Sequence, residues 1–379
     1  MQTLPGLMTT FLIIGQTALA AAQAPDPAPV TDHHPFMVQP GWDFSNVASE
    51  KETFTLTDDS TFVDYAMMLL KDGSGLPEAY TSSITTPVCD DSLCALMHIR
   101  IYWDLLGNYA GYDTVAGEPL TKNDHLEFMQ DDYIKLHKLL SDNNSIIKRK
   151  SKSELLDDTK TRVSEVVDAV TGATALEVKE AVVDGALYSS YTIYHIVYGP
   201  LSERIANYSD SIYKNSSYSN RLERKLLYSG SPEYQLYALK QLSPEDMDLH
   251  RDRLVKLVGE SIPLNRLYIM KKMPDAMWDD PEIQQGVAAY FNKMDISSRS
   301  WFLNRLKKLS LVSSNCLLLL SDNLHVMSKN QLRTFVELLS AQPGEPEKPL
   351  FQNIEEAISS KKLIYGYMLE EFIAEQAGK

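Results

Sequence analysis

The spacing of apolar residues after about residue 218 is the feature that most constrains what this chain folds into. From there to the C-terminus, strand-like alternation is lost and apolar residues recur three and four positions apart, as on one face of a helix. Ser-Pro-Glu and Asp-Pro-Glu sequences, which favour helix starts, recur in the same stretch. The spacing predicts helices over 220–228, 232–241, 244–258, 263–273, 280–293, 298–309, 311–321, 328–340, 350–360 and 362–375.

Short helices that begin again every ~30–40 residues are typical of helical repeats. We therefore predict an all-α domain over residues 218–379 with a HEAT-like solenoid arrangement; an irregular helical bundle fits the same pattern. No constellation of catalytic residues is found in this stretch, and its methionine and aromatic side chains are expected to form the core.

Residues 51–205 mix strand and helix patterns, which predicts an α+β domain. Cys94 to Asp104 and Tyr109 to Val115 have the character of two strands joined by a turn that contains Gly107. A short helix is predicted over 61–70, ahead of a turn cluster rich in glycine.

The apolar spacing also predicts a helix over 126–140. Its expected buried residues are Phe128, Tyr133, Leu136, Leu139 and Leu140. The charged residues 141–164, which include Lys148-Arg149-Lys150, are expected to form a solvated surface. A break between the domains is expected at 200–218, because Gly199-Pro200 ends a helix and residues 207–220 resemble a connector.

Residues 1–24 are typical of a secretory signal peptide, since an apolar run precedes small residues in Ala-x-Ala spacing. The run is short for a transmembrane helix and no second apolar span follows, so we predict an extracytoplasmic, periplasmic protein with no integral membrane span. Residues 25–50 are predicted to be a linker. The formal net charge of −15 argues against a nucleic-acid partner, because phosphates would be repelled.

Three cysteines remain after this leader, of which Cys89 and Cys94 are close together and Cys316 is distant. In an exported protein the close pair predicts a disulfide. Cys89, Cys94 and His98 match no common metal-site spacing, so no metal site is predicted.

Residues 168–174, Asp-Ala-Val-Thr-Gly-Ala-Thr, stand directly before an apolar helical pattern over 175–199. Gly172 and Ala173 carry almost no side chain, so a bulky group can approach the backbone there. Thr174 is expected at a helix N-terminus, where free N–H groups and the macrodipole favour an anion such as a phosphate.

This motif resembles the flavinylation motif of the FMN-binding domain family, which includes the C subunit of the sodium-translocating NADH:quinone reductase and the G subunit of the Rnf complex. The resemblance covers roughly residues 90–200. It implies FMN bound covalently to Thr174 through a phosphoester, with Thr171, Gly172 and Ala173 completing the motif. It also implies that Asp168 serves the flavin transferase that installs FMN.

The strand–turn–strand unit before the motif also resembles the family, and Trp103 in it is the first choice for contact with the flavin ring. The sequence departs from the family's pattern in two places. The stretch 117–125 lacks the family's glycine pattern, and Ala175, Leu176 and Glu177 replace the Ser or Thr that usually follows the motif. A second interpretation of the motif is a capping box, in which Thr174 and Glu177 start a helix without any ligand.

The resemblance predicts an electron-transfer flavoprotein, a redox carrier rather than a stand-alone enzyme, in which FMN supplies the chemistry. The expected partners are a flavin transferase and a redox protein that the sequence does not identify. No catalytic residue is assigned, since no Ser–His–Asp set, P-loop, Rossmann fingerprint or H-E-x-x-H motif is found. The alternative is a non-flavinylated extracytoplasmic scaffold that uses its helical repeats for protein contacts.

Overall fold

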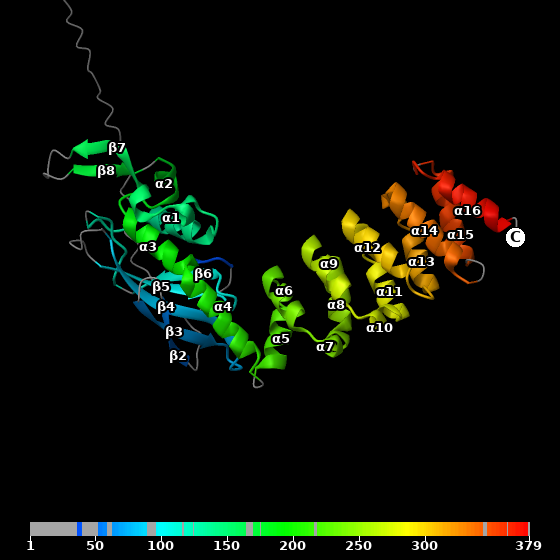
Figure 1. Ribbon diagram of the computed structural model, residues 1–379, viewed down its shortest axis with the longest axis horizontal. Helices are drawn as coiled ribbons and strands as arrows, with labels where there is room; N and C mark the ends of the chain where they lie inside the picture. The colour runs from blue at the N-terminus through cyan, green and yellow to red at the C-terminus, as the bar shows by residue number, and fades with distance from the viewer. Residues whose placement is uncertain are drawn as a thin grey trace, which may run out of the picture. The chain divides into compact units, whose positions relative to one another are not determined.

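The computed structural model describes residues 36–39, 52–58, 63–88, 96–115, 117–123, 125–163, 170–174, 176–215, 218–343, 347–361 and 363–377. At 52–58, 63–64, 156–163, 170–174 and 176 the description covers the backbone alone. The predicted signal peptide, Asp168, Cys89 and Cys94 lie outside the described residues. The chain divides into two compact units, residues 1–206 and 207–379. The first is α+β and the second is all-α in its described part (Figure 1).

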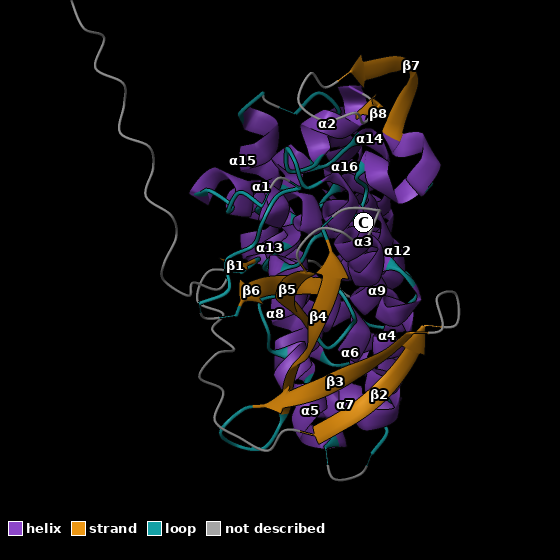
Figure 2. Cartoon of the chain, turned by 90° about the vertical axis from the view of Figure 1, so that its left-hand side faces the viewer, coloured by secondary structure: helices purple, strands orange, loops and turns teal. Residues whose placement is uncertain are grey.

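The first unit is built on an antiparallel six-stranded sheet with the order β1-β6-β5-β4-β3-β2. Its long strands twist strongly relative to one another, as strands of L-residues do (Figure 2). The strands are β1 (Phe36–Met37), β2 (Glu52–Asp58), β3 (Val63–Lys71), β4 (Pro77–Pro87), β5 (Leu96–Trp103) and β6 (Tyr109–Thr114).

The predicted strand–turn–strand unit is confirmed as the β5–β6 hairpin, in which Ile101 pairs with Tyr112. Its turn is closed by Asp104, whose Oδ1 accepts hydrogen bonds from the backbone N–H groups of Leu106 at 2.8 Å and Asn108 at 2.9 Å. Gly107 has a φ of 80°, a conformation that favours glycine. The hairpin therefore forms where local turn chemistry predicts it.

The helix predicted over 61–70 is wrong, because this segment is the strand β3 between β2 and β4. Met67, Leu69 and Leu70 are all buried, so apolar side chains lie on both faces of the strand. A run of this kind has no alternation, and its spacing alone does not distinguish a strand from a short helix. Pairing on both sides decided in favour of the strand.

Helices α1 (Gln130–Ser141) and α3 (Leu187–Tyr198) pack against each other and against the sheet, α1 on β6 and α3 on β4. All five residues expected to be buried between 126 and 140 are buried. Two α3 tyrosines fasten the helix pair: the Tyr194 hydroxyl donates to Asp142 O at 2.9 Å and the Tyr198 hydroxyl donates to Leu140 O at 2.6 Å.

The helical pattern over 175–199 does not form one helix. It is divided into α2 (Leu176–Ala181) and α3, with a turn between them at Gly185. Gly185 has a φ of 73°, and a Cβ there would lie 3.2 Å from Lys122 Cβ. The left-handed backbone and the close approach of Lys122 both require glycine at this turn.

The stretch 141–164 is more structured than a solvated surface. It contains the 3₁₀ turns η1 (Ile146–Arg149) and η2 (Lys152–Leu155) and the strand β7 (Leu156–Val163). Ile147 and Leu155 are buried, whereas most charged residues around them are exposed. Within the predicted linker 25–50, Phe36–Met37 forms β1 and pairs with β6.

The described helices of the second unit lie close to their predicted positions, and several predicted segments divide in two. Residues predicted as a connector are partly helical, since α4 (Pro200–Tyr213) crosses the division between the units. The remaining helices are α5 (Ser219–Leu227), α6 (Pro232–Gln241), α7 (Pro244–Leu249), α8 (Arg251–Glu260), α9 (Pro263–Lys272), α10 (Asp275–Trp278), α11 (Pro281–Ala288), α12 (Ile296–Leu306), α13 (Ser314–Ser321), α14 (Lys329–Ala341), α15 (Lys348–Ser359) and α16 (Tyr367–Ala377).

These helices stack in two rows. One row includes α8, α11, α13 and α15, and the other includes α6, α9, α12, α14 and α16, with each helix packed on the next in its row (Figure 1). In the first row, α5 and the four helices named begin 30 to 34 residues apart. In α6, α9 and α12, buried residues stand six, seven and ten positions after the first: Ala238, Leu239 and Leu242; Ile269, Met270 and Met273; Phe302, Leu303 and Leu306.

Buried side-chain amides join neighbouring helices of the second row at matching positions. Asn265, the third residue of α9, donates from Nδ2 to the carbonyl of Pro232, the first residue of α6, at 2.8 Å. Gln331, the third residue of α14, donates from Nε2 to the carbonyl of Ile296, the first residue of α12, at 2.9 Å. Among the described residues, no helix is both long enough and apolar enough to span a membrane.

Candidate functional site

The Thr-Gly-Ala-Thr motif forms the strand β8 (Val170–Thr174), which pairs with β7 in a two-stranded antiparallel ribbon. Thr174 is the last residue of β8 and stands opposite Leu156, while Ala173 stands opposite Asp157. Helix α2 begins two residues later, at Leu176, and has six residues. Thr174 was expected at a helix N-terminus. It is the last residue of a strand, and the helix that follows begins at Leu176 and is shorter than the pattern predicts.

Glu177, in the first turn of α2, forms an ion pair with the ammonium of Lys150. This hydrogen-bonded pairing raises the pKa of Lys150, and the lysine therefore stays charged. Lys150 follows directly after η1, which packs on α2, and its carbonyl accepts a hydrogen bond from the Tyr191 hydroxyl at 3.2 Å. Glu177 would repel a phosphate on Thr174, and the positive charge of Lys150 offsets this repulsion.

This pairing was not predicted from the sequence, where Lys148-Arg149-Lys150 has the pattern of an ordinary solvated run. Lys150 and Glu177 are 27 positions apart, so no local spacing relates them. The sequence did contain one signal for this pair. A basic run precedes the motif, and an acidic residue follows Thr174 by three positions, so charges of opposite sign lie on its two sides.

The loop before α1 reaches the other end of α2. The backbone N–H of Asn123 donates to Gly185 O at 2.7 Å, and Lys122 lies against Gly185. Lys122 also forms a 2.8 Å ion pair with Asp132 of α1. The stretch 117–125, which by resemblance helps to enclose a flavin ring, therefore meets the turn between α2 and α3.

Trp103, the residue expected to contact the flavin ring, is fully buried at the end of β5. Its Nε1–H donates to the carbonyl of Val197 in α3 at 3.2 Å. The indole therefore serves the packing between the sheet and α3, and its hydrogen-bond donor is already used. Trp103 therefore contacts α3, whereas the helix that follows the motif is α2.

An aromatic cluster between β1, β6 and α1 was not predicted as a unit. The Phe36 ring lies nearly parallel to Tyr112, with centroids 5.0 Å apart, and to Tyr133, with centroids 5.8 Å apart. The Tyr109 hydroxyl and His137 Nδ1 share a hydrogen bond of 3.0 Å. Burial raises the pKa of Tyr109 and lowers that of His137, so both groups are held neutral near pH 7.

Within the described part of the chain, no group of three or more His, Cys, Asp or Glu side chains is placed to hold a metal ion. Cys316 is a free cysteine, fully buried in α13, and burial raises the pKa of its thiol. A buried thiol of raised pKa is chemically inert.

Comparison of the chain with protein-family models, with curated proteins and with solved structures gave no match.

Proposed function

We propose that this chain is an exported electron-transfer flavoprotein that carries FMN covalently on Thr174 through a phosphoester. The observation that carries the proposal is the position of the Asp-Ala-Val-Thr-Gly-Ala-Thr motif at the β8–α2 junction, with Thr174 as the last strand residue. A junction of this kind presents the threonine at the end of a strand, next to the free N–H groups of a helix start.

The charges around the junction fit an attached phosphate. Lys150 balances Glu177, so the first turn of α2 carries no uncompensated acid from that residue. Lys135 approaches the end of the same helix, donating from Nζ to Lys179 O at 3.2 Å. Each end of α2 therefore has a lysine beside it, which limits the negative charge around this helix in a chain whose formal net charge is −15.

When bound, FMN would supply the redox chemistry, and the protein would supply attachment, environment and docking. Thr174 would hold the phosphate, Gly172 and Ala173 would leave room for it, and Lys150 would keep Glu177 from repelling it. A covalent link suits an exported protein, because a flavin lost outside the cytoplasm is not easily replaced.

For the second unit we propose a HEAT-like solenoid that docks a redox partner. Supporting this are the regular 30 to 34 residue spacing of its first-row helices and the matching amide bonds of Asn265 and Gln331. Solenoids present long surfaces for protein contact. The same observations favour the scaffold alternative, in which the first unit carries no flavin.

Intact mass separates the two functions. The full chain is exported together with a flavin transferase, and wild type, Thr174→Ala and Thr171→Ala are weighed under denaturing conditions. The proposal expects one FMN adduct on wild type and on Thr171→Ala, and none on Thr174→Ala. The control is a known substrate of the transferase, which must be modified under the same conditions. If that control is modified and the wild-type chain is not, the flavoprotein function is rejected and the scaffold function is favoured.

A further inference from the structure

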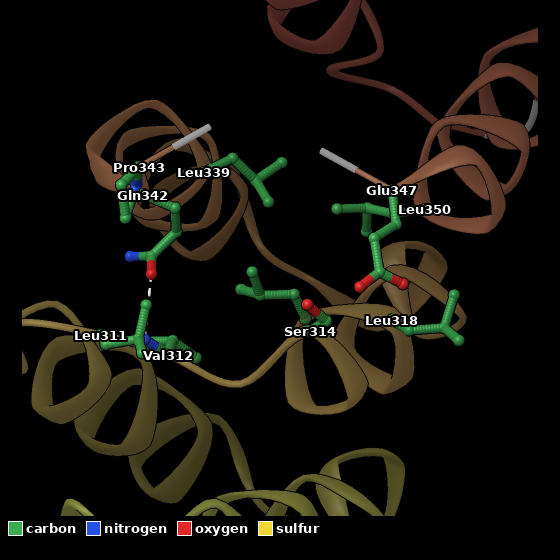
Figure 3. A pocket seen from close by; sticks show the side chains of 10 residues that line it. Leu311, Val312, Ser314, Leu318, Leu339, Gln342, Pro343, Glu347 and Leu350 are labelled. Carbon is green, nitrogen blue, oxygen red and sulfur yellow. Dashed lines mark hydrogen bonds between the residues drawn. The ribbon is translucent and has the colours of Figure 1, made fainter. Parts of the chain in front are cut away.

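The second unit has a hollow between the beginnings of α13 and α15 and the end of α14, with a cavity volume of about 90 Å³ (Figure 3). We call it the Glu347 hollow. Leu311, whose side chain is 62% exposed, opens it to solvent. A cavity of ~150 Å³ admits benzene, so this hollow has room for one branched aliphatic group. Its apolar wall consists of Leu311, Val312, Leu317, Leu318, Leu339 and Leu350.

Gln342 holds one side of the Glu347 hollow in place. Its Oε1 accepts a hydrogen bond from Val312 N at 2.9 Å, and its Nε2 donates to Leu338 O at 3.2 Å. Both polar ends of the amide are hydrogen-bonded within the protein, so Gln342 is held in place as part of the wall. The hollow is therefore formed without any occupant.

Glu347 gives the hollow its charge. The residue occupies the N-cap position of α15, yet its side chain makes no capping hydrogen bond. In Figure 3 its carboxylate points toward α13, in the direction of Ser314 and Leu318. The Glu347 side chain is exposed, and no hydrogen-bond or ion-pair partner of its carboxylate is found among the described residues. An unpaired carboxylate beside an apolar hollow favours an aliphatic group that carries a positive charge nearby.

A second hollow, of about 350 Å³, lies at the opposite ends of the same two helices. It is lined by Asp322 and Glu356, among others, and we call it the Asp322 hollow. Asn353 donates from Nδ2 to Ser321 Oγ at 2.9 Å and to Asp322 Oδ1 at 2.6 Å, which fixes this side of it. The eight residues of α13 separate the two hollows by ~12 Å.

The two hollows share the sign of their charge. Carboxylates line both, and neither has a Lys or Arg among its described lining residues; one histidine, His325, also lines the Asp322 hollow. Two anionic hollows ~12 Å apart on one helix pair suit an extended ligand better than a small molecule, which would occupy only one of them.

We propose that the α13–α15 pair is a docking site for a basic segment of a partner protein. A leucine or isoleucine side chain of the partner fills the Glu347 hollow, a neighbouring lysine or arginine pairs with Glu347, and a second basic residue ~12 Å further on meets Asp322 and Glu356. This inference rests on the docking role proposed for the second unit and not on the flavin.

The test uses the full chain with ¹³C-labelled leucine and valine methyl groups. The probe is the peptide Gly-Leu-Lys-Gly-Ser-Lys-Gly, in which an extended backbone places the second lysine ~10–13 Å beyond the leucine–lysine pair. We expect methyl shifts at Leu318, Leu350 and Val312 that saturate with peptide. A peptide with alanine for leucine, and one with glutamine for both lysines, should each bind about three- to ten-fold more weakly.

Glu347→Gln should weaken the leucine–lysine peptide about three- to five-fold, and Glu282→Gln, an exposed acid at the start of α11 outside both hollows, should leave it unchanged. Equal binding to wild type and Glu347→Gln, equal binding of the alanine peptide, or no methyl shift at all overturns the docking site. The same samples are weighed for FMN, so loss of peptide binding with the adduct present counts against the docking site alone, and peptide binding without the adduct counts against the flavoprotein alone.

Discussion

The Lys150 ammonium pairs with the Glu177 carboxylate three residues after Thr174, joining the basic run before the motif to the helix after it. The sequence places an acid, Glu177, close to a threonine that suits a phosphate, and the two negative charges would repel each other. The ion pair with Lys150 reduces this repulsion. It also gives the proposed function a residue that can be changed without touching the motif.

Reversing that charge should slow flavin attachment. In Lys150→Glu, two acids would face the phosphate position, and we expect the rate of adduct formation to fall about two- to five-fold, the range of a partly exposed ion pair. The measurement is the adduct fraction against time by intact mass. Lys148→Glu, in the same run and exposed, is the control, and adding Glu177→Gln should restore much of the rate. Equal rates in all four proteins would remove Lys150 from the site.

The free energy of unfolding should decrease as the pH is lowered, because His137 becomes protonated. Burial lowers the pKa of His137 below its value of ~6.5 in an unfolded chain. Its favourable contribution is therefore full above about pH 6.5 and is lost as the pH falls through the folded value. Urea unfolding at pH 7.5 and 5.5 should show a smaller loss for His137→Gln than for wild type. His195, whose pKa burial also lowers, should add to the effect in a double variant. A pH slope unchanged by both substitutions would contradict the prediction.

The number of cysteines that can be alkylated should differ before and after reduction. Cys316 is fully buried, and a disulfide is predicted between Cys89 and Cys94. Exported protein denatured without reductant should take up one alkyl group per chain, on Cys316, and three after reduction, since the chain has three cysteines. Peptide mapping locates the labels. Three labels without reductant would exclude the disulfide and weaken the argument for export.

Replacing Arg266 should lower the free energy of unfolding of the second unit more than replacing an exposed arginine. The side chain is 7% exposed and donates to Val258 O at 2.6 Å, Ser261 O at 3.0 Å and Asp295 Oδ2 at 3.2 Å. Arg266→Met removes the donor to Val258 O and Ser261 O and leaves Asp295 Oδ2 with the Ser298 hydroxyl alone, which should cost about 2–4 kcal/mol of unfolding free energy. Arg251→Met, which breaks more exposed ion pairs, should cost clearly less unfolding free energy. Chemical denaturation followed by circular dichroism compares them, and similar losses would contradict this account.

Limited trypsin digestion should cut first after Lys214. This exposed residue follows directly after α4, which ends at Tyr213, whereas Arg204 lies inside the hydrogen-bonded helix. Mass spectrometry of early fragments should find the flavin, where present, on the piece that contains residues 170–174. First cuts at Arg204, or within α8 to α14, would place the weakest point of the chain elsewhere.

Local signals explain why the helices of the second unit were predictable. The prediction 232–241 coincides with α6, because Ser231 Oγ accepts from Tyr234 N and a proline stands at the first turn. Asp280 likewise accepts from an N–H group of α11, which it precedes, whereas Ser313 caps α13 at a start three residues later than the predicted 311. Capping of this kind depends on neighbours in sequence, so the sequence alone is enough to locate the helix start.

Long-range pairing explains what was missed. The strand β3 depends on partners in β2 and β4, and its apolar run gives no periodicity of its own. The break at Gly185 depends on Lys122 lying against it from a loop 63 positions earlier. The candidate site was predicted only as a motif followed by a helix. Its strand β8 depends on pairing with β7, and the Lys150–Glu177 pair depends on how η1 packs against α2.

The matching bonds of Asn265 and Gln331 have a consequence for how such a chain changes over generations. Each amide joins a helix to the one before it in the second row. A deletion that removed Pro232 of α6 would therefore leave the Asn265 amide without its carbonyl acceptor in that row.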